Sequence, residues 1–253
     1  MKIKILTLNI WGGELLGNII KFIRKENPDI VLFQEVNNGT NDLDSKFRSF
    51  DILKKEIGLS YCAFEPLFLD VWSTNKIPQG NAVFSRFPIE NQKAIFFDIP
   101  FGEFSLKDGK NDVSKNQFLP MGILKANVNV NGKNIYTYSL HGIWGFDGED
   151  NARRLEMSRI IVDEIKDKEN VILAGDFNLK PHTKTIKNIE KYLDNVFDEE
   201  LISTFNMKHK KLPGYATAAV DMILISKHFK VTSHYMPDID VSDHRPLICE
   251  VEI

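Results

Sequence analysis

The stretch Val171-Ile172-Leu173-Ala174-Gly175-Asp176-Phe177-Asn178 (171–178) joins a run of apolar residues to a polar end. A short apolar run followed by turn residues is typical of a buried strand. Such a strand carries the side chains at its end, here Asp176 and Asn178, to a fixed position in the fold. The stretch therefore predicts a buried sheet with a polar site beside the carboxyl end of this strand.

Polar side chains also stand next to other apolar runs: Asn9, Glu35, His141 and the pair Asp243-His244. Each of these residues alone is better explained as a turn or cap residue than as a catalytic one. Their repetition indicates that several strand ends converge on one rigid site. Carboxylate, amide and imidazole groups are those that a hard divalent cation and acid–base catalysis require. Because no cysteine takes part, a structural zinc site is not expected.

The remainder of the chain is a mixture of expected strands and helices. Strands are expected at 3–9, 29–33, 61–65, 67–72, 81–85, 89–97, 121–130, 134–141, 171–174, 221–226, 229–236 and 246–253. Helices are expected at 14–26, 43–57, 149–167 and 182–193. Residues 98–118 contain Gly, Asp, Asn, Lys and Ser and are predicted to form a long loop. This order indicates sheets in the middle of the molecule with helices outside them.

Length and composition favour one large unit. The chain has 253 residues, of which 43% are hydrophobic. A chain of this length buries roughly 70–75% of its unfolded surface, which is enough for one core. Because no linker, repeat or low-complexity tract interrupts the sequence, we expect a single domain over residues 1–253. A monomer is also expected. A net charge of −3 and a pI near 6.1 argue against binding nucleic acid by bulk charge, although a nuclease needs only a local basic rim.

The sequence also carries information on the compartment. No apolar run approaches the ~18 residues of a membrane span, and the N-terminus lacks the long apolar segment and cleavage site of a signal peptide. We therefore expect a cytoplasmic protein, or a secreted one if a leader was removed. Cys62 and Cys249 lie far apart in the sequence and are interpreted as buried thiols in a reducing compartment.

Short runs spread over nearly the whole chain occur in the order of a known superfamily. They are LTLNIW (6–11), FQEV (33–36), GNAVFSRFPI (80–89), LHG (140–142), GDFN (175–178), VDMILIS (220–226) and SDHRPL (242–247). The chain resembles the endonuclease/exonuclease/phosphatase superfamily, which includes deoxyribonucleases, apurinic-site endonucleases, sphingomyelinases, inositol polyphosphate 5-phosphatases, deadenylases and tyrosyl-DNA phosphodiesterases. GDFN and SDH together are specific, whereas either alone is weak. The resemblance implies an α/β fold, a four-layer αββα sandwich of two central mixed sheets flanked by helices, with the site at one rim.

The resemblance also implies a metal site. Glu35 matches the main metal ligand, and Asn9 and Asp243 lie beside the same ion, directly or through water. The implied ion is Mg²⁺, for which Mn²⁺ can substitute. Mg²⁺ prefers few carboxylates, octahedral oxygen ligation and retained waters, which suits this set.

Five residues match the catalytic positions of the superfamily. Asp176 would orient or deprotonate the attacking water, and Asn178 would donate to a non-bridging phosphate oxygen. His244 would contact the scissile phosphate or act as the base, with Asp221 accepting its other ring N–H. His141 matches a second histidine of the deoxyribonuclease and sphingomyelinase branches and would protonate the leaving oxygen or bind phosphate.

Other polar residues are candidate substrate contacts. Asn81 is expected near the phosphate. Arg153 and Arg154 begin the helix after His141 and are interpreted either as substrate contacts or as part of a solvated helix face. The basic cluster 208–211 is interpreted as a solvated charged surface.

The implied reaction is attack of water on a phosphate ester, and the sequence leaves the substrate open. The first hypothesis is a nuclease acting on DNA or RNA, with Trp11, Trp72, Trp144 and Phe146 as aromatic residues that could stack on bases. The alternative is a phosphatase or a sphingomyelinase-like phosphodiesterase acting on a small molecule or a lipid headgroup. A non-catalytic binding module ranks last, because Glu35, Asp176 and His244 are all present.

Overall fold

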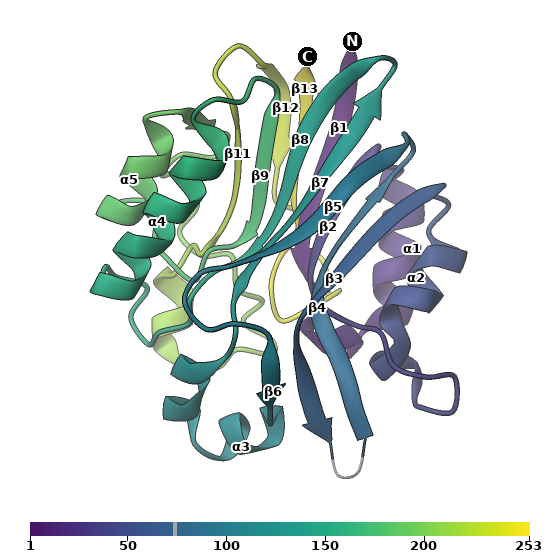
Figure 1. The fold of residues 1–253 in the computed structure, drawn as a ribbon, viewed down its shortest axis with the longest axis vertical. Coiled ribbons are helices and arrows are strands. Elements are labelled where there is room, and N and C mark those ends of the chain that lie inside the picture. The colour runs from purple at the N-terminus through teal and green to yellow at the C-terminus, as the bar shows by residue number, and fades with distance from the viewer. Residues whose placement is uncertain (73–74) are drawn as a thin grey trace.

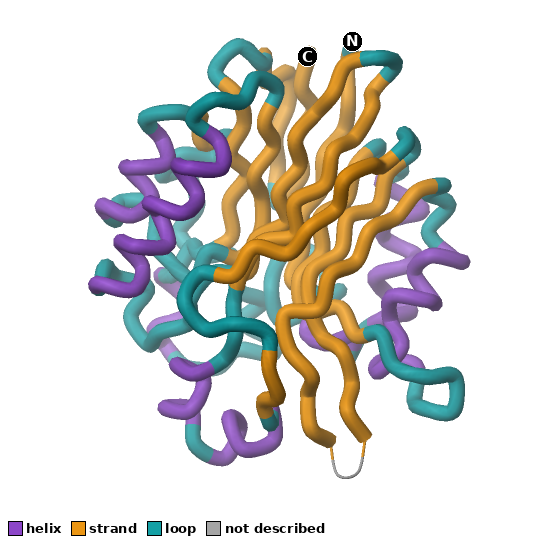
Figure 2. Tube along the Cα trace, in the orientation of Figure 1, coloured by secondary structure: helices purple, strands orange, loops and turns teal. Residues whose placement is uncertain are grey.

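Two mixed sheets lie face to face at the centre of the molecule, and helices cover both outer faces (Figures 1 and 2). The computed structural model describes residues 1–72 and 75–253. In this part of the chain the first sheet contains, in spatial order, β12 (Lys230–Tyr235), β13 (Leu247–Glu252), β1 (Lys2–Asn9), β2 (Ile30–Asn37), β4 (Asn75–Ser85), β3 (Tyr61–Trp72) and β6 (Gly102–Phe104). The second contains β10 (Leu193–Asn195), β11 (Asp221–Ser226), β9 (Val171–Asp176), β8 (Lys133–His141), β7 (Gly122–Val130) and β5 (Ile89–Phe96). This architecture confirms the predicted sandwich.

Helices of two regions flank the sheets. In Figure 1, α1 (Leu16–Glu26) and α2 (Ser49–Glu56) cover the first sheet, and α4 (Ala152–Ile165) and α5 (Lys184–Glu190) cover the second. The inner face of α1 is apolar at helical spacing, with Leu16, Ile19, Phe22 and Ile23 buried. The helix ends at Glu26 and is followed by Asn27, whose φ of 53° is left-handed, as is common for the residue after a helix. Within the described residues no helix combines the length and the apolarity needed to cross a bilayer.

Apolar residues on both faces of β1 explain why it lies in the interior. Ile3 and Ile5 belong to the cluster between the two sheets, together with Leu124, Ile172 and other residues of the second sheet. Leu6 and Leu8 point the other way, into the cluster under α1 and α2. Side chains alternate between the faces of a strand, so a strand that is buried on both sides needs apolar residues at consecutive positions.

Strand pairing brings the polar strand ends to one edge. The parallel pair β1–β2 aligns Asn9 with Gln34, and the parallel pair β8–β9 aligns His141 with Asp176. The antiparallel pair β9–β11 aligns Asp176 with Asp221. The chain termini lie at the opposite end of the strands (Figure 1). The strands therefore hold the polar ends in fixed register at one end of the sandwich.

The prediction of a loop over residues 98–118 is wrong. This segment contains β6, α3 (Leu106–Asn111) and a 3-10 helix (Val113–Phe118). Ser105 caps α3 by accepting a hydrogen bond from the backbone N–H of Asp108, and Asp70 accepts one from the N–H of Leu106. The rings of Phe68 and Phe104 meet with their centroids 6.0 Å apart. Packing against β3 therefore orders a segment whose composition is typical of loops.

Some expected boundaries also change. The two strands expected at 61–65 and 67–72 form one strand, β3, which carries an irregularity between Pro66 and Phe68 in its pairing with β4. The helix expected at 43–57 is a 3-10 turn (Ser45–Arg48) followed by α2. The side chain of Trp72, one of the candidate base-stacking residues, lies outside the described part of the chain.

Candidate functional site

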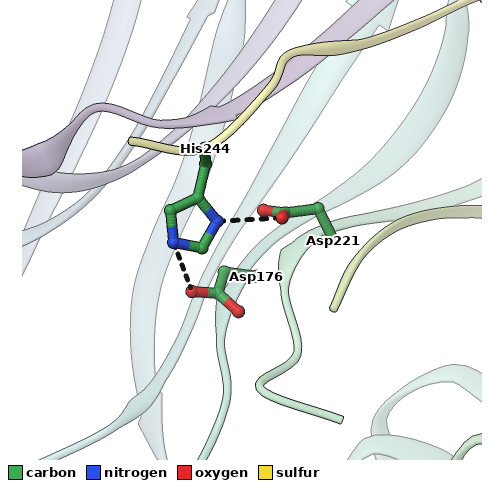
Figure 3. Close-up of side chains that lie close together, drawn as sticks. All are labelled: Asp176, Asp221 and His244. Carbon is green, nitrogen blue, oxygen red and sulfur yellow. Dashed lines mark hydrogen bonds and ion pairs between the residues drawn. The ribbon is translucent and has the colours of Figure 1, made fainter. Parts of the chain in front are cut away.

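Asp176, Asp221 and His244 come together from three elements at this edge (Figure 3). Asp176 ends β9, Asp221 begins β11, and His244 lies in the loop before β13. The three side chains are almost completely buried. His244 Nδ1 lies 2.9 Å from Asp221 Oδ2, and His244 Nε2 lies 3.8 Å from Asp176 Oδ2. The imidazole therefore stands between two carboxylates, as Figure 3 shows.

The charge of His244 follows from these neighbours. Burial lowers the pKa of His244, but the Asp221 and Asp176 carboxylates outweigh this effect and raise it to about 10. An imidazolium at neutral pH carries both ring protons, so Nδ1 donates to Asp221 and Nε2 presents an N–H toward Asp176. Asp221 is itself held at its backbone, where its N–H donates to Thr204 Oγ1.

The last residues of β9 and the turn after it place Asp176. Gly175 has a φ of 149°, and an added Cβ would lie 2.0 Å from the carbonyl oxygen of Leu140, so only glycine fits. Asp176 Oδ1 then accepts a hydrogen bond of 2.8 Å from the backbone N–H of Asn178. The Asn178 side chain donates to the carbonyl of Gly142 at 3.0 Å. An Asx-type turn thus fixes the direction in which the Asp176 carboxylate points.

A second histidine lies beside the same carboxylate. His141 is 7% exposed, and its Nε2 lies 3.7 Å from Asp176 Oδ2. The same carboxylate oxygen thus faces His141, His244 and, at 3.2 Å, Asn9 Nδ2. The structure brings these predicted residues together around one oxygen atom.

Asn9 and Glu35 form the part of the site contributed by the first sheet. Asn9 Nδ2 donates to Glu35 Oε1 at 2.9 Å, and Asn9 Oδ1 accepts from the backbone N–H of Trp11 at 3.0 Å. Glu35 has a φ of 57°, and the pairing of β2 with β4 is irregular between Phe33 and Val36. A bulge of this kind redirects a side chain at the end of a strand. Asn9 therefore orients the Glu35 carboxylate through its amide nitrogen.

Asp243 is fixed by the backbone around it. Ser242 Oγ donates to the carbonyl of Asn9 at 2.6 Å, which ties the loop before β13 to the end of β1. Asp243 Oδ2 lies 2.8 Å from Lys210 Nζ. The Lys210 side chain is 30% exposed and turned toward Asp243, whereas Lys208 and Lys211 are exposed. Sequence reasoning missed this contact, because four polar residues in a row (208–211) show no periodicity that would mark one as inward.

The donor set suits a hard divalent ion. Glu35 and Asp243 supply carboxylate oxygens, and partly exposed Glu35 leaves room for the waters that Mg²⁺ retains. Asp176, Asp221 and His244 also form a group in which one ligand atom of each lies within 4.8 Å of the others. In that group the imidazole is already engaged with Asp221, which suits proton transfer better than the binding of an oxygen-seeking ion.

Three predicted substrate contacts lie elsewhere. Asn81 is buried, and its Nδ2 donates to the carbonyls of Gly122 at 3.1 Å and Ser139 at 2.8 Å. Arg153 pairs with Asp98 and donates to the carbonyl of Gln117 at the surface. Neither side chain belongs to the group around Asp176.

Arg154 is completely buried. Its guanidinium donates to Asp147 and to the backbone carbonyls of Ile143, Glu149 and Asn178. These contacts occupy its N–H groups and brace the segment between β8 and α4. Arg154 therefore contacts the backbone of Asn178 and not the side chains around Asp176.

Solved structures share this fold. A Beutenbergia cavernae endonuclease/exonuclease/phosphatase has a TM-score of 0.77 at 17% identity, with 100% of this chain and 72% of that chain covered. D. rerio TDP2 complexed with a single strand DNA product has a TM-score of 0.72 at 16% identity, with coverage of 100% and 99%. The human Nocturnin catalytic domain with bound sulfate has a TM-score of 0.64 at 18% identity, with coverage of 99% and 94%.

The comparison of sequences gives the family. No curated protein matches the chain significantly. The model of the Endonuclease/Exonuclease/phosphatase family matches residues 6–244, which span all of the site described above. Members of this family are generally hydrolases of phosphoester bonds and depend on a divalent metal. The chain belongs to the endonuclease/exonuclease/phosphatase family.

Proposed function

We propose that the protein is a Mg²⁺-dependent phosphodiesterase that cleaves nucleic acid by attack of water on the phosphodiester. The observation that carries this proposal is the buried His244–Asp221 pair facing Asp176, with His141 near the same carboxylate oxygen. Hydrolysis of a phosphodiester needs an acceptor for the proton of water, a donor for the leaving oxygen and positive charge beside the phosphate. These residues supply all three within one buried cluster.

The arrangement assigns a step to each side chain. Asp176 orients the attacking water and takes its proton. The N–H at His244 Nε2 donates to a non-bridging phosphate oxygen, where negative charge grows in the transition state. His141 delivers a proton to the leaving oxygen, and Asn178 fixes the direction of Asp176 through the turn. When bound by Glu35 and Asp243, Mg²⁺ or Mn²⁺ supplies Lewis-acid charge to the phosphate.

The choice of nucleic acid as substrate class is supported by the rim of the site. Trp11 follows Asn9 closely, and its ring lies 5.0 Å from the ring of His209. Both residues are partly exposed, so this aromatic pair is available to stack on a base. Lys208 and Lys211 are exposed beside them and can contact phosphates. The fold is also that of D. rerio TDP2, whose structure contains a single strand DNA product.

A lipid phosphodiesterase is the second candidate. Phe101, Phe118 and Phe146 are exposed by 45%, 61% and 75%, and large exposed aromatics suit a membrane surface. The fold is shared with SmcL at a TM-score of 0.68 and 16% identity. This candidate predicts turnover of phospholipid vesicles, which the first does not.

One assay separates the candidates. Hydrolysis of supercoiled plasmid, single-stranded DNA and RNA, bis-p-nitrophenyl phosphate, p-nitrophenyl phosphate and sphingomyelin vesicles is measured with Mg²⁺, Mn²⁺ or EDTA. Cleavage of nucleic acid that needs metal and is lost in His244→Ala supports the proposal. The matched control is His228→Ala, which removes an exposed histidine that is hydrogen-bonded to Asn170. Both residues lie at the end of β9 and β11 opposite to Asp176 and Asp221. Lipid turnover without nucleic acid cleavage selects the second candidate. The absence of hydrolysis of every substrate contradicts both candidates.

A further inference from the structure

Lys210 places a cation inside the acidic part of the site. Its Nζ lies 2.8 Å from Asp243 Oδ2, and Asp243 is only 3% exposed. The ammonium also lies over the rings of Phe205 and Tyr215, 5.8 and 5.4 Å from their centroids. A buried carboxylate without a counter-charge is costly, so this lysine compensates Asp243 where solvent cannot.

The contact is built into the backbone. Asn206 N donates to the carbonyl of Asp243 at 2.8 Å, and Lys210 N donates to the carbonyl of Asn206 at 3.1 Å. The Asn206 side chain donates to the carbonyl of Ser242 at 2.9 Å. The segment that carries Lys210 is therefore anchored to the segment that carries Asp243, and the ion pair is a fixed feature of the site.

The Lys210 ammonium lies against an oxygen, Asp243 Oδ2, that a divalent ion bound at Asp243 would use. Glu35 and Asp243 are the carboxylates that fit a divalent ion. The lysine and the ion therefore compete for the same negative charge.

We propose that Lys210 is a resident cation of the site, which neutralises Asp243 and thereby lowers the affinity for a divalent metal. This inference rests on the proposed metal-dependent function. It gives Lys210 a positioning role, since its ammonium contacts Asp243 and not the reacting atoms. Without a metal, Asp243 is then paired with Lys210 while Glu35 keeps an uncompensated charge, and the metal binds weakly enough to exchange.

Direct titration of the full-length protein with Mn²⁺ by isothermal titration calorimetry tests this proposal. Lys210→Met keeps the stem that packs on Phe205 and removes the charge. We expect it to bind Mn²⁺ about tenfold more tightly than the wild type, the order expected when a unit charge a few ångström from a divalent ion is removed. Lys210→Arg, which keeps the charge, should restore affinity close to that of the wild type. A role in packing alone would weaken binding or leave it unchanged in Lys210→Met.

Matched controls isolate the pair. Lys211→Met makes the same change in net charge at an exposed neighbouring position and should alter the affinity less than about twofold. Adding Asp243→Asn to Lys210→Met should abolish the gain, because the carboxylate that was released is then absent. Equal affinities of Lys210→Met and the wild type overturn the role of Lys210 alone. Absence of Mn²⁺ binding in both proteins overturns it together with the proposed metal dependence.

Discussion

Asn9 donates a hydrogen bond of 3.2 Å to Asp176 across the interface between the two sheets. The two residues are 167 positions apart in the chain and end neighbouring strands of opposite sheets. The same amide nitrogen donates to Glu35 at 2.9 Å. One side chain therefore sets the spacing between Glu35, the carboxylate of the proposed metal site, and Asp176, the carboxylate that faces the histidines.

Loss of this amide should misplace both carboxylates. Asn9→Ala is expected to lower kcat/KM on the order of 10²-fold, the cost of shifting a catalytic group by about 1 Å. Steady-state kinetics on the substrate identified by the assay above measures this effect. Asn38→Ala, a change of the same type in a loop after β2, is the control. A rate within about twofold of the wild type would show that neither carboxylate depends on Asn9.

The orientation of His244 should depend on Asp221. Asp221→Asn removes the charged acceptor at Nδ1, so we expect kcat to fall by roughly 10- to 100-fold. His244→Ala removes the donor itself and should lower kcat by about 10²- to 10⁴-fold. Because both changes act on one group, the double variant should be no slower than His244→Ala. Additive losses would mean that Asp221 serves the reaction independently of the histidine.

Arg154 and Arg153 are neighbours in sequence with opposite expected roles. Arg154→Met leaves buried carbonyls without donors, and we expect the free energy of unfolding to fall by about 2–4 kcal/mol. Arg153→Met removes an exposed ion pair and should change it by less than about 1 kcal/mol. Urea unfolding of both variants checks this prediction. A stable Arg154→Met protein with weakened substrate binding would return Arg154 to the substrate site.

The pair of Lys4 and Glu26 should make stability depend on acid pH. Burial raises the pKa of Glu26, but hydrogen bonds from Lys4 and Tyr235 outweigh it, and the net pKa lies below the 4.5 of a free glutamate. A carboxyl whose pKa is depressed in the folded state stabilises the protein above the unfolded pKa, and this contribution is lost as pH falls through the folded pKa. Unfolding of Glu26→Gln and the wild type is compared at neutral pH and in steps below pH 4.5. The wild type should be the more stable at neutral pH, with a difference that shrinks below pH 4.5. A constant difference would contradict the assignment.

The sequence predicted those parts of the fold that have a simple repeating cause. Apolar runs such as 171–174 form strands because they are buried on both faces, and the register of β8 with β9 then places His141 beside Asp176. Segment 98–118 was missed because it is ordered by contacts with β3, such as Phe104 on Phe68, and not by its own pattern.

The sequence also did not predict which polar side chains form hydrogen bonds with buried backbone groups. Asn81 and Arg154 occupy positions near site motifs, yet both donate to buried carbonyls. Lys210 faces inward because the backbone of Asn206 is bonded to that of Asp243, a contact between distant segments. Polar residue types alone do not distinguish these roles from solvation.

The residues of the site are divided between the two sheets, so catalytic turnover depends on how the sheets are positioned relative to each other. Glu35 belongs to the first sheet and Asp176 to the second, and the Asn9 amide is a short bridge between them. A small slide of one sheet over the other would break this bridge while each sheet kept its own hydrogen-bonded ladder. Catalytic turnover is thus sensitive to the relative position of the two sheets. It should decrease in mild denaturant before the circular dichroism signal of the strands changes.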